Sequence, residues 1–390
     1  MAKDKNAQDL ASRLSSFKQK KEGDMQPSDH SSKQSEKQDG AKMSILKDMT
    51  SSNKELKAAT AAGPVGLDIG TSHIVMAQSS GEKVKISSQL NAFFTVPNSK
   101  VTYKTLQVNQ VKFFEHDNNL YIFGFSAQDF ANMFNANLRR PIESGIVSAR
   151  EEEGIMVIQS LLGDLIPKPS SLGMPLCFGV PGEPVDGKGS VIYHEAILSR
   201  YLRFLGYNPT PINEGLATVM SELKDDGFTG IGISMGGGMC NVCMAYMSVP
   251  VFSFSIQKGG DYVDQMAAES VGESITKMNQ IKEEELDFTQ KLTTRVSMAL
   301  NIFYEDLIST LLESLHNAVR STERLPRIKQ KIPIVLSGGT VMPRGFVDKF
   351  KVQLKKYPMP FDIADVRRAN EPLITTAQGA LFVANNEAEE

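Results

Sequence analysis

The chain has 390 residues, of which 41% are hydrophobic, and its 42 Lys and Arg side chains nearly balance 45 Asp and Glu side chains, for a net charge of −3. This length exceeds one simple core and indicates two domains or one large bilobed body. A charge balance so near neutrality argues against a protein that works by neutralising phosphates, so we expect no nucleic-acid partner.

The cysteine content and the first residues bear on the compartment. Three cysteines, Cys177, Cys240 and Cys243, are too few and too odd in number for a disulfide framework, which indicates a reducing environment. The sequence contains no apolar run of about 18 residues, and its polar N-terminus has no apolar signal-peptide core. We therefore expect a cytoplasmic protein.

Residues 1–62 differ in composition from the rest of the chain, because Lys, Asp, Gln and Ser dominate them and Phe17 is their one aromatic residue. Such a segment buries too little apolar surface to offset the entropy of ordering, so we predict a disordered polar tail over 1–62. Leu10, Leu14 and Phe17 would form a short apolar stripe on a basic helix, and a second helix is predicted over 43–62. Two interpretations stay open: a solvated tail, and a contact with a membrane or a partner protein.

From Val65 onward, short apolar runs alternate with glycine turns and with periodic helical segments. The pattern predicts one α/β series up to about residue 206 and a second series after it. We predict strands over 65–70, 73–80, 83–90, 174–181, 228–238, 240–248, 251–260 and 332–338 and near Pro211, and helices over 191–206, 214–223, 264–286, 292–321, 347–356 and 375–385; the segments 118–134 and 139–166 pass from strand to helix.

Glycine turns between strands occur at matched places in the two series. DIGTS begins at Asp68 and SMGGG begins at Ser234, each at the tip of a hairpin. Two such hairpins facing each other would direct backbone N–H groups toward one point, which suits phosphate. A third glycine turn, LSGGTVMPRGF, follows a strand and leads into a helix, where the helix dipole also favours an anion. One glycine turn alone is more often only a tight turn, but three together predict a nucleotide cleft.

The ordered motifs DIGTS, PIESGIVS, SMGGG, GGDYVD, LSGGTVMPRGF and TTAQGALF resemble those of the actin and seventy-kilodalton heat-shock ATPase superfamily. In length and spacing they are most similar to the bacterial actin homologue MreB, over residues 65–384. This resemblance implies an α/β, actin-like (ribonuclease H-like) fold of two lobes with a central nucleotide cleft. Lobe I would span 63–208, completed by the C-terminal helix in 371–390, and lobe II would span 209–370.

The resemblance further implies ATP or ADP and Mg²⁺ as ligands. Asp68 would face the metal through water, although it could instead be a hairpin-turn acid. Lys282 would contact the ribose and adenine, although it could be a solvated helix face, and His73 follows the first turn closely enough to touch a phosphate. The remaining residues implied to hold the nucleotide are Gly70, Thr71 and Ser72 in one lobe, Gly236, Gly237 and Gly238 in the other, and Gly338, Gly339 and Thr340 around the adenosine.

Two departures from the family pattern bear on chemistry. Ser234 stands where the family has an acid that holds a magnesium-bound water, so it would be a weak metal contact, and an acid restored there is expected to speed hydrolysis about 10-fold to 100-fold. The family also places a water-orienting glutamate at a helix start. After the strand 174–181 the matching place falls near Tyr193 or His194. The nearest acid on that helix is Glu195, which is either a displaced equivalent or, as we favour, an exposed helical acid.

Cys240 and Cys243 form a C-x-x-C pattern, but their odd spacing on a strand points the side chains to opposite faces, which favours structural cysteines over a zinc or redox pair. The resemblance as a whole implies an ATP-binding cytoskeletal protein that forms nucleotide-dependent filaments with slow hydrolysis. The alternative is a non-polymerising nucleotide-binding adaptor of the FtsA or PilM type. In either case the tail would allow membrane association of a cytoplasmic protein.

Overall fold

The computed structural model describes residues 60–389, except 82, 135, 148–150, 152, 186, 188–189 and 323–329. The folded body already includes the first described residues, because Ala61 is buried and its N–H donates to the Lys168 carbonyl at 2.7 Å. The tail predicted over 1–62 and the helix predicted over 43–62 are therefore wrong at residues 60–62. The rest of both predictions, including the stripe at Leu10, Leu14 and Phe17, lies outside the described residues.

The first of two large sheets has the strand order β10-β9-β1-β2-β3. Strands β1, β2 and β3 form an antiparallel meander, and β9 and β10 run parallel to β1. Leu67 of β1 stands opposite Met76 on one side and Phe178 on the other. The strand bounds are β1 Val65–Ile69, β2 His73–Ser80, β3 Lys83–Leu90, β9 Met174–Val180 and β10 Tyr207–Asn213.

The second large sheet repeats this topology with the strand order β13-β12-β11-β14-β15. Strands β11, β12 and β13 form the antiparallel meander, and β14 and β15 run parallel to β11. Because the topology is duplicated, the hairpins β1–β2 and β11–β12 occupy equivalent places. The strand bounds are β11 Gly230–Met235, β12 Cys240–Tyr246, β13 Val249–Ile256, β14 Ile332–Ser337 and β15 Ile363–Arg368.

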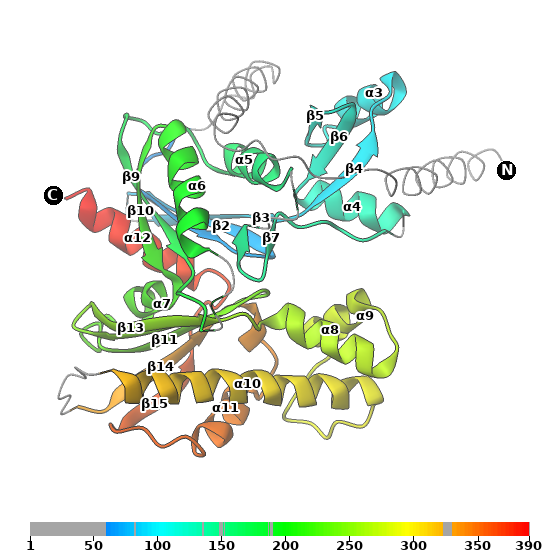
Figure 1. Ribbon diagram of the computed structural model, residues 1–390. Helices are drawn as coiled ribbons and strands as arrows, with labels where there is room; N and C mark the ends of the chain where they lie inside the picture. The colour runs from blue at the N-terminus through cyan, green and yellow to red at the C-terminus, as the bar shows by residue number, and fades with distance from the viewer. Residues whose placement is uncertain are drawn as a thin grey trace, which may run out of the picture. The chain divides into compact units, whose positions relative to one another are not determined.

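Helices cover both large sheets, as Figure 1 shows. The long helix α10 (Arg295–Ser321) lies along the second sheet and buries Leu300, Leu307 and Leu311 against it. Its start is fixed by a capping box between Thr294 and Ser297. On the first sheet, α12 (Thr375–Glu387) packs on β1 and β9, and α6 (Val191–Phe204) packs on β10. Helix α7 (Glu214–Glu222) packs on both α12 and the second sheet.

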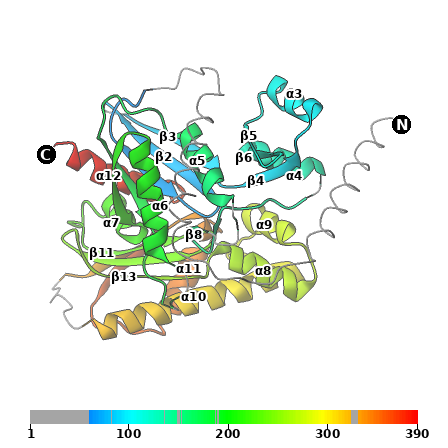
Figure 2. The ribbon, with the colours of Figure 1, turned by 45° about the horizontal axis from the view of Figure 1, so that its top comes forward.

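Smaller elements extend each half of the body. A three-stranded sheet, β4-β6-β5, carries α3 and α4, and Figure 2 shows α8 and α9 beside the start of α10. The boundary predicted between residues 208 and 209 falls inside β10, which belongs to the first sheet. The remaining bounds are β4 Phe93–Pro97, α3 Lys100–Val108, β5 Phe113–His116, β6 Asn119–Phe123, α4 Phe125–Phe134, β7 Ile142–Glu143, β8 Ile146–Val147, α5 Gly154–Leu165, α8 Gly260–Val271, α9 Ile275–Glu284, the 3₁₀ turn η1 Gly339–Val341 and α11 Phe346–Leu354.

The body carries no membrane-spanning candidate within the residues described, since none of their helices is both long and apolar enough to cross a bilayer. Cys240 lies in the core beneath α10, whereas Cys243 is buried on the side of its strand that faces Gly215 of α7. The prediction that these two cysteines point to opposite faces is thus confirmed.

Candidate nucleotide site

The first glycine turn joins β1 to β2 and is held by a buried asparagine. The Gly70 N–H donates to the His73 carbonyl at 3.0 Å, which closes the turn. Asn91, which is fully buried, donates from Nδ2 to the Gly70 carbonyl at 2.8 Å and from its own N–H to the Ser72 carbonyl at 2.8 Å. Both bonds are accepted by carbonyl oxygens of the turn, so Asn91 fixes the shape of the turn. The sequence did not single out this residue.

The second glycine turn joins β11 to β12 and rests on the start of α8. The Gly260 N–H donates to the Gly236 carbonyl at 3.0 Å, and the Asp261 N–H donates to the Gly237 carbonyl at 2.8 Å. In the part of the chain that the structure describes, the N–H groups of Gly237 and Gly238 donate to no protein atom. These two donors are therefore free for an anion.

The two turns meet tip to tip. A Cβ atom added at Gly237 would lie 2.6 Å from Ser72 Oγ, and one added at Gly238 would lie 2.5 Å from Thr71 Oγ1. Thr71 Oγ1 also accepts a hydrogen bond at 3.1 Å from the N–H of Gly145, in the turn between β7 and β8. The structure thus brings the two predicted phosphate turns together. Glycine is required at 238, because a Cβ atom there would also lie 2.6 Å from the backbone nitrogen of Gly145, whereas the contacts at 237 are the ends of side chains.

The third glycine turn braces the second. Gly338 has a φ of 90°, and a Cβ atom there would lie 2.3 Å from the Met235 carbonyl oxygen. Thr340, in the 3₁₀ turn that begins at Gly339, donates from Oγ1 to the Gly236 carbonyl at 2.8 Å. All three predicted turns therefore form one cluster.

Two carboxylates lie beside these turns. Asp68 belongs to β1, and Glu214 is the first residue of α7, whose start is capped by Asn213 through a bond from the Leu216 N–H at 3.1 Å. Each carboxylate keeps part of its surface accessible. Burial by the surrounding protein raises the pKa of Asp68 well above its usual value, the charge of Glu214 raises it further, and burial likewise raises the pKa of Glu214. Such a pair favours a nearby positive charge.

The carboxylate pair fits a hydrated magnesium ion better than a protein metal cage. Among the residues described, no three His, Cys, Asp or Glu side chains are grouped to hold a metal directly, and neither Asp68 nor Glu214 belongs to an ion pair there. Mg²⁺ commonly binds through one or two carboxylates, waters and substrate phosphates. Asp68 is therefore suited to the water-mediated role implied for it.

Ser234 makes a different contact from the one its position implied. Its Oγ donates to Glu214 Oε2 at 3.2 Å, and Asn241 Nδ2 donates to the same oxygen at 2.8 Å. Sequence reasoning missed both Glu214 and Asn241. The available signal was a glutamate directly after an asparagine cap, at the start of the predicted helix 214–223. Glu195, by contrast, lies on α6, away from these contacts.

Lys282 and His73 are placed at the edges of the cluster. Lys282 donates from Nζ to Asp264 Oδ2 at 2.6 Å and to the Gly260 carbonyl at 3.3 Å, and it is buried, which rules out a solvated helix face. His73 begins β2 with part of its ring exposed. Burial lowers the pKa of His73, the charge of Glu283 raises it, and the charge of Arg140 lowers it.

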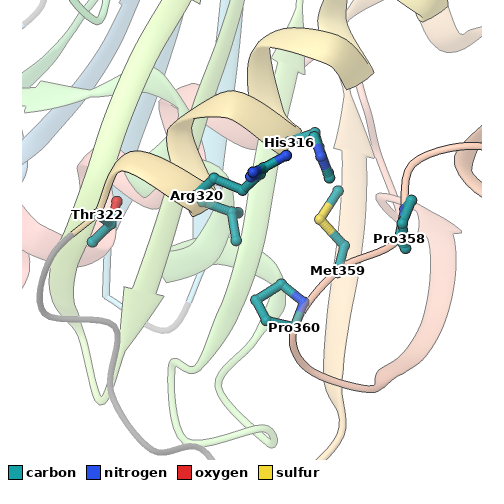
Figure 3. A pocket seen from close by; sticks show the side chains of 7 residues that line it. His316, Arg320, Thr322, Pro358, Met359 and Pro360 are labelled. Carbon is teal, nitrogen blue, oxygen red and sulfur yellow. The ribbon is translucent and has the colours of Figure 1, made fainter.

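A separate cavity of about 490 Å³ lies at the far end of α10, where Figure 3 shows His316, Arg320 and Met359 around it. None of the residues predicted to hold the nucleotide lines this cavity. We therefore place the candidate nucleotide site at the three glycine turns, on the chemistry of the turns and the carboxylates.

Solved structures of actin-like proteins share this fold. The MamK double helical filament matches with a TM-score of 0.63 at 21% identity, covering 84% of this chain and 98% of that chain. MreB 5 of Spiroplasma citri bound to AMPPNP matches with a TM-score of 0.59 at 13% identity, covering 84% and 97% of the two chains. The predicted α/β, two-lobed actin-like fold is thereby confirmed.

Sequence comparison gives the same class of protein. The actin-like protein MamK of Paramagnetospirillum magneticum is 21% identical over 349 residues, or 82% of this chain and 91% of that protein. MamK of Magnetospirillum gryphiswaldense is 21% identical over 345 residues, or 82% and 88%. The chain is a member of the actin and MreB-like superfamily. More narrowly, the Volactin family model matches residues 64–384, and the chain belongs to the Volactin family.

Proposed function

We propose that this protein binds ATP or ADP with magnesium between its two glycine hairpins and assembles into filaments according to the nucleotide bound. The meeting of the two hairpins beside Asp68 and Glu214 carries the proposal, because the N–H donors of Gly237 and Gly238 have no acceptor among the residues described. The AMPPNP in the matched MreB structure supports nucleotide binding, and the matched MamK filament supports self-association.

The residues of the cluster have distinct parts in this proposal. Magnesium would supply positive charge to the phosphates, with Asp68 holding one of its waters. Glu214, rather than Glu195, would orient the water that attacks the γ-phosphate, because it starts a helix, as the family's glutamate does, and lies beside Asp68. We propose that the protein turns over ATP slowly.

Calorimetry and electron microscopy test the two halves of the proposal separately. Titration with ATP and with ADP, each in magnesium, should show one site per chain, and Asp68→Asn should weaken the magnesium-dependent part of binding about 10-fold to 100-fold. The matched control is Asp129→Asn, an exposed acid on α4. No binding by the wild-type protein would refute the nucleotide site.

Filaments should appear in negative stain with ATP and magnesium and be lost without nucleotide. Binding without filaments under any nucleotide would refute polymerisation and support the adaptor alternative. The state of the protein would then depend on whether ATP or ADP is bound, and not on assembly.

A further inference from the structure

Glu214 is held by two donors that converge on one of its oxygens. Asn241 Nδ2 and Ser234 Oγ both donate to Oε2, at 2.8 and 3.2 Å. The two donors come from neighbouring strands, where Ser234 of β11 and Asn241 of β12 are directly paired in register. Among the described residues no donor reaches Oε1 of Glu214. One carboxylate oxygen is thus fixed, and the other is left to accept a bond from something outside the protein.

Asn241 is itself fixed from the other side. Its Oδ1 accepts the N–H of Gly182 at 2.9 Å, and Asn241 is almost fully buried. Gly182 is held in turn, because its carbonyl accepts Ser255 Oγ at 2.8 Å. A Cβ atom at Gly182 would lie 2.7 Å from the Phe254 carbonyl carbon, so only glycine allows this close approach. With its carbonyl on Gly182 and its amino group on Glu214, the Asn241 amide has one orientation that satisfies both ends.

We propose that Asn241, assisted by Ser234, is the positioning residue of Glu214 in ATP hydrolysis, which rests on the proposed function. By holding Oε2, the pair presents Oε1 to the attacking water. In the step so assisted, the water oxygen bonds to the γ-phosphorus while the bond to the β–γ bridging oxygen breaks, and that electron pair leaves with ADP. The water gives its proton to Glu214 Oε1, from which it is released to solvent.

This role explains why a hydroxyl suits position 234. An aspartate there would remove the donor to Glu214 and place a third carboxylate beside Asp68 and Glu214, where like charges oppose one another. The expectation from sequence, that Ser234→Asp speeds hydrolysis, is therefore reversed: we expect it to slow hydrolysis.

Steady-state hydrolysis and ADP affinity, measured on the full chain, separate positioning from structure. Asn241→Asp keeps the shape and the acceptor for Gly182 but replaces the donor with a further carboxylate beside Glu214, and should lower kcat about 10-fold to 100-fold, more than it lowers ADP affinity. Ser234→Ala tests the loss of a donor without an added charge. Ser234→Ala, which removes the longer bond, should lower kcat by less than about tenfold. The matched control is Asn301→Asp, which likewise loses an amide donor to a glutamate, here Glu305 on α10, and should leave both quantities near wild type.

The outcomes decide between the claims. The positioning role would be overturned if Asn241→Asp kept the wild-type kcat. It would also be overturned if ADP affinity fell as much as kcat in both Asn241→Asp and Ser234→Ala. Faster hydrolysis in Ser234→Asp would overturn the donor role of Ser234. A wild-type protein that binds ATP without hydrolysing it would overturn the inference while leaving the nucleotide site standing. A wild-type protein that binds no nucleotide would overturn the proposed function together with the inference.

Discussion

A buried histidine supports the segment that reaches the glycine turns. His194 of α6 accepts a hydrogen bond on Nδ1 from the Val147 N–H at 3.2 Å. Val147 ends β8, two residues after Gly145, whose N–H donates to Thr71 in the first turn. Burial lowers the pKa of His194 to about 4, because the charged ring would lose its solvation. A proton on Nδ1 would also remove the acceptor that Val147 uses.

This histidine should make stability depend on pH. Between pH 6.5 and about 4 the unfolded chain binds a proton that the folded chain excludes, so the free energy of unfolding falls as the pH is lowered through this window. The loss from this one group between pH 7 and pH 5 is about 2 kcal/mol. His194→Asn supplies an amide oxygen as acceptor and does not titrate, so urea unfolding at the two pH values should show a smaller decrease in the variant. Identical decreases in both proteins would contradict the assignment.

At the residue scale, sequence reasoning succeeded where the backbone imposes a residue type. Glycine is required at 238, where a Cβ atom would lie 2.6 Å from the Gly145 nitrogen, and at 338, where it would lie 2.3 Å from the Met235 carbonyl oxygen, and such requirements leave a pattern along the chain. Glu214 leaves no such pattern, since the environment of this helix residue comes from Asp68, Ser234 and Asn241 on three different strands. Which acid of several lies in the site is decided by packing, so position along the chain could not tell Glu214 from Glu195.

At the scale of elements, α7 and α12 cross in close contact. A Cβ atom added at Gly379 of α12 would lie 1.9 Å from the Ala217 carbonyl oxygen of α7. The same helix approaches β1, where a Cβ atom at Gly66 would lie 2.2 Å from the Ala377 carbonyl oxygen. Since α7 carries Glu214 at its first residue, the packing of these two helices determines where the carboxylate lies.

Gly379→Ala should destabilise the protein, because the added methyl group must push α7 and α12 apart. We expect a loss of about 1–3 kcal/mol in the free energy of unfolding. The matched control is Gly163→Ala on α5, where the methyl group would meet only the Tyr201 hydroxyl at 3.1 Å and the change removes a helix-weakening glycine. Urea unfolding of both variants checks this. Equal stabilities for the two variants would show that the helix crossing can relax.

Elements were hardest to predict at the sheet edges. β10 is an edge strand that contains two prolines, and edge strands tolerate proline because one side makes no ladder bonds. The strand predicted near Pro211 corresponds to β10, but the lobe boundary implied by the resemblance, between residues 208 and 209, cuts through it. β15 is the edge of the second sheet and carries two arginines and an aspartate, so its sequence has no apolar run. β4, α3 and β5 belong to the small sheet and were also missed.

At the scale of the whole body, an ion pair ties the two repeated halves together. Arg140, just before β7, donates from Nη1 to Asp261 Oδ2 at 2.8 Å. Asp261 lies in the first turn of α8, and its N–H holds the Gly237 carbonyl of the second glycine turn. Both side chains are about one-third exposed, at 34% and 38%, so solvent weakens the pair without removing it. If a nucleotide binds between the hairpins as proposed, this pair links the two halves directly beside it.

We therefore expect Arg140→Gln to speed nucleotide release about twofold to fivefold, as for the loss of one partly exposed ion pair. Stopped-flow displacement of a fluorescent ADP measures the rate. Raised salt should speed release from the wild type more than from the variant, because salt screens the ion pair in the wild type and the variant has no such pair.

The control is Arg139→Gln, whose ion pairs with Glu151 and Glu153 involve only residues that precede α5. If Arg140→Gln releases ADP no faster than Arg139→Gln, the Arg140–Asp261 pair does not hold the halves together. If Asp261→Asn speeds release and adding Arg140→Gln speeds it no further, the two side chains act as one unit.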